Sequence, residues 1–160
     1  MSARRPAAPA VEVDASVRSR PSAAAVAGWA AACLSAAGRR KGTMSVLLCG
    51  DRRMRTLNRV WRKKDRPTDV LAFPSGETGP AAFVGDVAID LPYAERQASR
   101  LGNSLEREVQ LLLAHGILHL LGHDHETDDG TMFALQRRLV CKVFGPGPDG
   151  VPPTGRRPAP

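Results

Sequence analysis

Residues 115–125 read His-Gly-Ile-Leu-His-Leu-Leu-Gly-His-Asp-His and contain all four histidines of the chain. His115 and His119 are four positions apart, so on a helix they lie on the same face, one turn above the other. Gly122 predicts the end of this helix, because glycine adopts the left-handed conformation of a helix C-terminus without steric cost. The turn that follows can bring His125 back toward the first two histidines.

Imidazoles at this spacing predict a metal site formed by His115, His119 and His125. Three protein ligands leave one position of a tetrahedral site open, which is typical of catalytic zinc, whereas structural sites usually have four ligands. His123 also lies four residues after His119, but it is about 12 Å beyond His115 along a continuous helix. Metal–nitrogen bonds are only ~2.0–2.1 Å long, so His123 is not selected as a ligand and its role stays open.

The same spacing occurs in metzincin proteases, with one difference that matters chemically. Those enzymes need a glutamate directly after the first histidine as the general base. Gly116 occupies that position and has no side chain. The sequence therefore predicts a metal site without the base of a metalloprotease.

The helix that carries these histidines is expected to lie at the centre of the fold. It begins after Ser104, a favourable N-cap residue, and it is apolar on more than one face. Further helices are expected at about 22–38, 52–61, 91–101 and, after Asp128 or Asp129, up to about 144. Strands are expected at 11–14, 43–49, 68–73 and 83–90. The predicted class is α+β, a mixed four-stranded sheet with about five helices.

The helix expected at 52–61 has an apolar stripe and many basic residues. Asp51 is its predicted N-cap, and Met54, Leu57 and Trp61 recur at helical spacing, so we expect all three to pack on the sheet. From residue 39 to 66 there are eleven basic and two acidic residues, within a chain of net charge +7. From 69 to 95 there are five acidic residues and no Lys or Arg. This distribution fits a polyanion-binding patch or a solvated helix face.

Size and composition limit the remaining choices. A chain of 160 residues is long enough for one domain, which we place at residues 10–144. Residues 1–9 and 145–160 are rich in proline, alanine or glycine and are expected to be disordered. No apolar run is long enough to span a membrane. The three cysteines are far apart, which argues against a disulfide framework and favours the cytoplasm.

Four blocks together resemble the YbeY family of bacterial rRNA maturation factors. Residues 115–125 resemble the signature HGxLHLxGYDH of that family, and residues 57–62, 66–74 and 85–89 resemble its other blocks in the same order. The resemblance covers roughly residues 11–143. Two positions depart from the family pattern: the signature tyrosine is His123, and the usual serine before Phe-Pro is Ala72.

The resemblance implies a single-strand-specific, metal-dependent endoribonuclease acting in maturation and quality control of the small-subunit (16S) rRNA. It implies one Zn²⁺, or another divalent transition metal, at His115, His119 and His125, and a functional arginine at Arg62. An arginine suits a phosphate substrate, since its guanidinium stabilises the charge that builds on the phosphoryl oxygens. The implied partners are single-stranded RNA, the small ribosomal subunit and its assembly factors, with no membrane and no DNA.

Some alternatives stay open. Asp124 either orients a metal-binding histidine or is a turn residue that bonds the backbone. The protein as a whole could instead hydrolyse another substrate such as a peptide, against which Gly116 argues. It could also be a non-catalytic ribosome-assembly factor whose metal only holds the fold.

Overall fold

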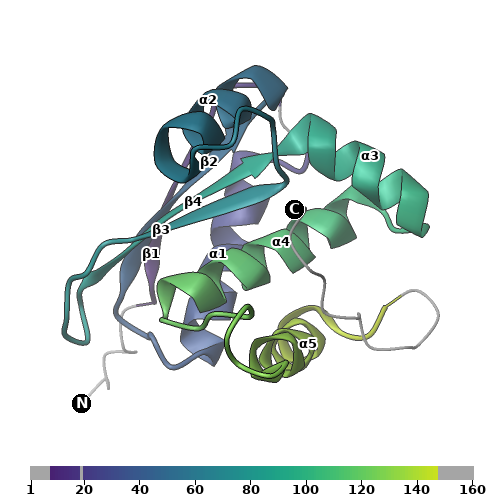
Figure 1. Cartoon of the computed structure of the whole chain (residues 1–160). Coiled ribbons are helices and arrows are strands. Elements are labelled where there is room, and N and C mark those ends of the chain that lie inside the picture. The colour runs from purple at the N-terminus through teal and green to yellow at the C-terminus, as the bar shows by residue number, and fades with distance from the viewer. Residues whose placement is uncertain (1–7, 19, 148–160) are drawn as a thin grey trace, which may run out of the picture.

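The computed structural model describes residues 8–18 and 20–147 (Figure 1). In this part of the chain the predicted class is confirmed, with one four-stranded mixed sheet and five α-helices. The disorder predicted for the two ends falls mostly on residues 1–7 and 148–160, which lie outside the described residues.

The sheet has the order β1-β2-β4-β3. Strands β1 (Ala10–Ala15), β2 (Thr43–Cys49) and β4 (Phe83–Asp90) run parallel, and β3 (Val70–Pro74) pairs antiparallel with β4 at the edge. Because successive side chains of a strand point to opposite faces, β4 divides its residues between two apolar layers. Val87 and Ile89 belong to the main core, whereas Ala88 belongs to a smaller cluster on the other face.

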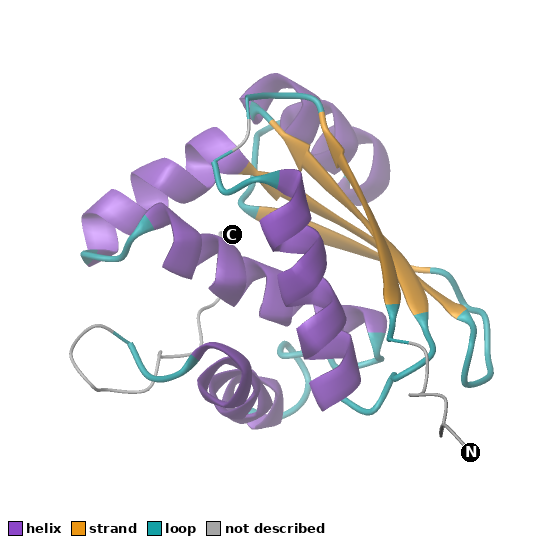
Figure 2. Cartoon of the chain, turned by 180° about the vertical axis from the view of Figure 1, so that it is seen from behind, coloured by secondary structure: helices purple, strands orange, loops and turns teal. Residues whose placement is uncertain are grey.

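Helices cover the two faces of the sheet unequally (Figures 1 and 2). The main core lies between the sheet and α1 (Ala23–Ala36), α4 (Leu105–Leu120) and α5 (Thr131–Phe144). Helix α3 (Leu91–Leu101) packs beside α4. On the opposite face α2 (Asp51–Arg62) covers only the small cluster around Met54. Part of that face of the sheet is therefore left open beside α2.

Helix α4 is central, as predicted. Its side chains are buried almost from end to end, between the sheet, α3 and α5. At its N-terminus Ser104 caps the helix by accepting the backbone N–H of Arg107, as expected. Near its middle Gly116 lies against β4, where an added Cβ would stand 2.8 Å from Cγ1 of Val87.

Three local predictions are wrong. Gly50, not Asp51, is the N-cap of α2, and the Asp51 carboxylate forms an ion pair with Arg96 instead. Gly130 is the N-cap of α5, although the Asp128 carboxylate accepts the N–H groups of Gly130 and Met132. Trp61 is not buried against the sheet with Met54, because it is 65% exposed and meets the Phe73 ring of β3 edge to face.

In the part of the chain that the structure describes, no helix combines the length and apolar character needed to cross a membrane.

Candidate metal centre

The end of α4 redirects the chain toward the helix. Gly122 has a φ of +96°, the left-handed conformation that glycine adopts without strain. The N–H of Gly122 bonds the carbonyl of His119 at 3.0 Å, and the N–H of His123 bonds that of Leu118 at 3.1 Å. This is the hydrogen-bond pattern of a Schellman C-cap. The residues after it form the turn that carries His125.

The turn brings three histidines together, two from α4 and one from beyond Gly122. Each of His115, His119 and His125 has a ring nitrogen within 4.8 Å of the other two. Nδ1 of His125 lies 3.1 Å from Nε2 of His119. Two nitrogen ligands at ~2.0–2.1 Å from a tetrahedral zinc would be about 3.3 Å apart. The pair His119–His125 is therefore already near the spacing of two zinc ligands, the group of three could hold a metal ion, and His123 is not part of it.

His115 is oriented by a residue that sequence reasoning missed. Its Nδ1 lies 2.9 Å from Oε1 of Gln136, a buried residue of α5. Nε2 of Gln136 makes a long hydrogen bond of 3.5 Å to the carbonyl of Leu111, so Oε1 is the atom left to accept from His115. Nδ1 then carries the proton and Nε2 of His115 carries a lone pair. Nε2 is buried and has no hydrogen-bond partner among the described residues, which is the state expected of a metal ligand.

The electrostatics of the cluster favour neutral imidazoles. Burial, together with a smaller effect of the neighbouring histidines, lowers the pKa of His115 to about 4, against the opposing effect of Gln136. Burial also lowers the pKa of His119, as do His125 and the charge of Arg62, while Asp124 raises it. Metal ligation requires the neutral ring. The two helix histidines are therefore in the protonation state needed at neutral pH.

The histidines line a cavity of about 610 Å³. Arg62, the last residue of α2, lies in its wall, so the structure brings the predicted arginine to the histidines although 53 positions separate Arg62 from His115. Asp124 and Glu126 also line this cavity. The Asp124 carboxylate accepts the backbone N–H of Glu126 at 3.0 Å, which is the behaviour of a turn residue.

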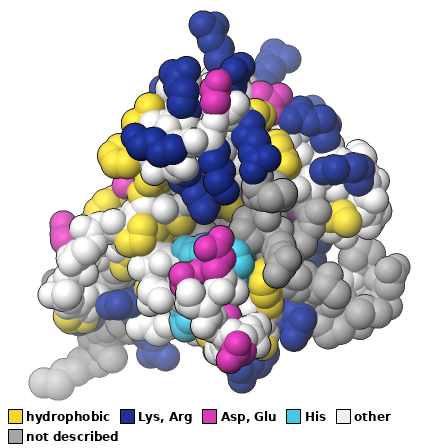
Figure 3. Space-filling model, viewed as in Figure 1, with side chains coloured by type: hydrophobic (Ala, Val, Ile, Leu, Met, Phe, Trp, Pro, Cys, Tyr) yellow, Lys and Arg dark blue, Asp and Glu magenta, His cyan; other side chains and the backbone are white. Residues whose placement is uncertain are grey.

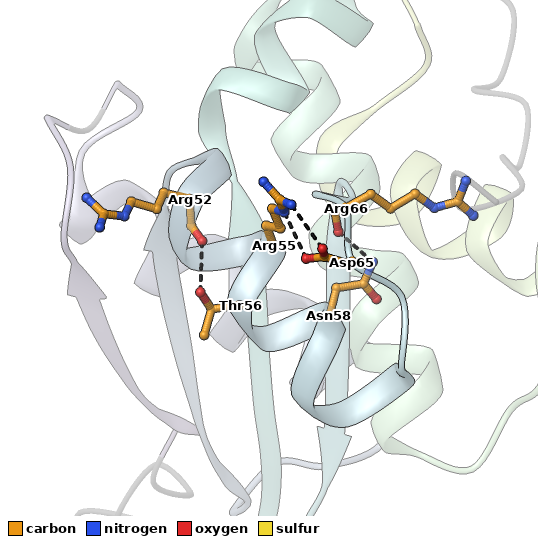
Figure 4. A network of polar contacts seen from close by, with 6 residues as sticks. All are labelled: Arg52, Arg55, Thr56, Asn58, Asp65 and Arg66. Atoms are coloured by element: carbon orange, nitrogen blue, oxygen red, sulfur yellow. Dashed lines mark hydrogen bonds and ion pairs between the residues drawn. The ribbon is translucent and has the colours of Figure 1, made fainter.

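Polar contacts between α2 and the loop that follows it hold this loop in place (Figure 4). The side-chain amide of Asn58, buried under α2, donates to the carbonyl of Arg66 at 2.8 Å. Arg55 and Asp65 form a two-pronged ion pair with both N···O distances at 2.9 Å. Lys63 ends the helix in the left-handed conformation, at a φ of +60°. These contacts turn the chain directly after Arg62.

Basic side chains gather over α2 and this loop, above the histidines (Figure 3). The exposed members of this group are Arg52, Arg53, Arg55, Arg59, Arg62, Lys63, Lys64 and Arg66. Both acidic residues of the same segment are in ion pairs, Asp51 with Arg96 and Asp65 with Arg55. The larger part of the basic segment seen in the sequence, residues 52–66, therefore forms one surface beside the cavity that Arg62 lines, whereas Arg39, Arg40 and Lys41 lie before β2.

Comparison with known proteins decides the family. The model of the family described as endoribonuclease YbeY matches residues 14–143. The chain belongs to the YbeY family.

Several members of the family are similar to this chain. The endoribonuclease YbeY of Aquifex aeolicus is 54% identical over 99 residues, which cover 61% of this chain and 66% of that protein. The corresponding protein of Solibacter usitatus is 50% identical over 97 residues, covering 61% and 63%. In both cases the chain spans slightly less than two thirds of the relative. A solution structure of a protein from Thermotoga maritima is 28% identical, with a TM-score of 0.63 over 84% of this chain and 89% of that one.

The two departures from the YbeY pattern both lie at the cavity. His123 and Ala72 line it, but neither belongs to the three-histidine group. The structure also explains why position 116 is glycine. A side chain there would press on Val87, a stiff β-branched residue buried in β4. The protease base is therefore excluded by packing as well as by sequence.

Proposed function

We propose that this protein is a metal-dependent endoribonuclease that cleaves single-stranded RNA, with Zn²⁺ held by His115, His119 and His125. Family membership supports the reaction class, since the curated relatives are named endoribonucleases. The observation that carries the site is the buried, unpartnered Nε2 of His115 beside two further histidines. A buried nitrogen without a partner is costly unless something binds it.

The proposed chemistry divides between the ion and the chain. When bound, the zinc ion supplies Lewis acidity and activates water at neutral pH. Gln136 keeps the proton of His115 on Nδ1, which leaves Nε2 free for the ion. Arg62 is proposed to bind the scissile phosphate and to stabilise the charge that develops on its oxygens. The guanidinium suits this role because it stays charged and matches phosphate geometry.

Asp124 is proposed to act on the histidines through its charge. In the described residues its carboxylate accepts no hydrogen bond from a histidine, but that carboxylate raises the pKa of His119. It thereby offsets the effect of Arg62 on the same ring. Its carboxylate also accepts the backbone N–H of Glu126, which stabilises the turn that contains His125.

The cellular role that we propose is maturation and quality control of small-subunit rRNA in the cytoplasm. The partners would be single-stranded rRNA, the small subunit and its assembly factors, without a membrane or DNA. The basic surface over α2 supports a nucleic-acid substrate, since Lys and Arg neutralise backbone phosphates. Residues 10–144 are proposed to form the single endoribonuclease domain.

One assay tests the proposal and separates it from its alternatives. The purified chain is incubated with single- and double-stranded RNA and with an unstructured peptide, with zinc or with a chelator. We expect cleavage of single-stranded RNA that zinc supports and the chelator stops. His115→Ala should abolish it, and Arg62→Ala should lower it about 10²–10³-fold, the typical effect of losing one transition-state donor.

Arg100→Ala is the matched control, because Arg100 is an exposed arginine of α3 away from the cavity. It should cleave like the wild type. Peptide cleavage by the zinc-loaded chain would instead favour a different metallohydrolase. Tight binding to the small subunit that survives His115→Ala, without cleavage of any RNA, would favour a non-catalytic assembly factor.

A further inference from the structure

Trp61 is a large aromatic side chain that α2 leaves in solvent. Its side chain is 65% exposed, although the helical spacing predicted that it would pack on the sheet. Its ring meets the ring of Phe73 edge to face, with centroids 5.7 Å apart. Single exposed apolar residues are common on protein surfaces and need no explanation by themselves. The position of Trp61 is what distinguishes it.

Trp61 lies in the wall of the histidine cavity, beside Arg62. Together with Phe73 and Pro74 it also borders a second groove, on the part of the sheet that α2 leaves open. The charged residues that line this second groove are three carboxylates, Glu12, Asp14 and Asp86, and one guanidinium, Arg53 of α2, so acidic groups are in excess. The Trp61–Phe73 pair therefore separates the histidine cavity, which Arg62 borders on the side of α2, from a groove in which carboxylates outnumber the single arginine.

This arrangement restricts the path of a polyanion. Phosphates are repelled by the acidic groove and attracted by the basic surface over α2. A strand of RNA with one phosphate at Arg62 then extends along α2 and not across the sheet. Trp61 is the exposed aromatic ring at the start of that path, where the cavity meets α2.

We infer that Trp61 stacks against a nucleobase next to the phosphate held at the histidines, and that it contributes to the preference for single strands. The inference rests on the proposed function. An indole stacks on any base, because each base has a π-face. A base in a duplex has both faces covered by its neighbours, whereas an unpaired base can turn out and stack on an aromatic side chain. A stacking residue at the cavity therefore discriminates by strandedness and not by sequence.

Fluorescence tests the contact directly. The chain has two tryptophans, and Trp29 lies on α1 in edge contact with Phe144. In Trp29→Phe the emission comes from Trp61 alone. Titration of the zinc-loaded variant with a short single-stranded RNA should quench this emission, and the same RNA in a duplex should quench it far less.

Cleavage tests the consequence. Trp61→Ala should lower kcat/KM on single-stranded RNA about 5- to 150-fold, the factor that corresponds to one base–aromatic stack. Trp61→Phe should recover most of the activity, because phenylalanine also stacks. Val60→Ala is the matched control, since Val60 is 50% exposed on the same helix and should behave as the wild type.

The possible results separate the inference from the proposed function. Cleavage of single-stranded RNA without quenching, or with equal rates in Trp61→Ala and Val60→Ala, overturns the stacking role. Quenching by single-stranded RNA without cleavage supports the stacking role and contradicts the proposed function. Neither quenching nor cleavage contradicts both.

Discussion

Replacing Gln136 by leucine should weaken metal binding without removing a single proposed ligand. Oε1 of Gln136 accepts the Nδ1–H of His115 at 2.9 Å, and both side chains are buried. In Gln136→Leu the metal-bound form would keep an Nδ1–H with no acceptor, at a cost of about 1–3 kcal/mol. The other tautomer avoids this cost but places the proton on Nε2, the atom that the ion needs.

Because both tautomers of His115 are unfavourable for zinc binding in Gln136→Leu, the affinity for zinc should fall. Partners behind a metal-binding histidine typically change the affinity for the metal about 10–100-fold. That factor corresponds to about 1.4–2.7 kcal/mol, within the range for one unsatisfied buried donor. Gln136→Glu retains an acceptor oxygen and should bind zinc at least about as tightly as the wild type.

Zinc affinity is measured by competition with a chromophoric chelator, and circular dichroism of the metal-free chains monitors the fold. Gln110→Leu makes the same substitution at a half-buried position of α4 and should leave the affinity unchanged. An unchanged dissociation constant in Gln136→Leu, with the fold intact, would refute the role given to Gln136. Equal losses in the leucine and glutamate variants would refute the hydrogen-bond argument specifically.

Two further predictions concern stability. Gly116→Ala should destabilise the protein by about 1–3 kcal/mol in urea unfolding, since the added Cβ meets Val87 at 2.8 Å. The control is Gly28→Ala in α1, where nothing lies within 4 Å of the added Cβ; it should stabilise the protein by up to about 1 kcal/mol. Equal effects of the two substitutions would contradict the packing argument. Asp90 caps α3, and burial raises its pKa to about 7, helped by Asp51. Because this folded-state pKa lies above the unfolded value, the stability that the group contributes is complete below about pH 4 and lost as the pH rises through 7. Asp90→Asn keeps a capping oxygen and cannot ionise. Its free energy of unfolding, measured in urea and compared with that of the wild type, should therefore rise by about 1–3 kcal/mol between pH 5 and 8. A difference in free energy that stays constant across that range would contradict the raised pKa of Asp90.

Much of the fold was predictable because it depends on local patterns. Alternating or continuous apolar runs located the strands, and capping residues such as Ser104 located helix starts. The one-turn spacing of His115 and His119, followed by Gly122, was enough to select His125 over His123. That selection needed only helix geometry and the length of a metal–nitrogen bond. The errors at Asp51 and Asp128 concern which residue of a turn acts as the cap, and this depends on where nearby groups lie.

Other features depended on contacts that no local pattern records. The stripe Met54, Leu57, Trp61 has the spacing of a buried face, but only Met54 is buried, whereas Trp61 meets Phe73 of β3 edge to face and stays 65% exposed. Gln136 has no distinguishing sequence context. It becomes important because α5 packs on α4 and places its amide at His115, 21 positions away.

The sequence by itself predicted which three imidazoles converge, because four histidines in eleven residues and a glycine stop restrict the choice. It also determined that position 116 offers no base. Only the tertiary structure decided the rest of the site: the proton on Nδ1 of His115, the approach of Arg62, and the exposed ring of Trp61. The physical reason is that spacing along one helix is fixed by the backbone, whereas contacts between elements depend on how α2, α4 and α5 pack around the sheet.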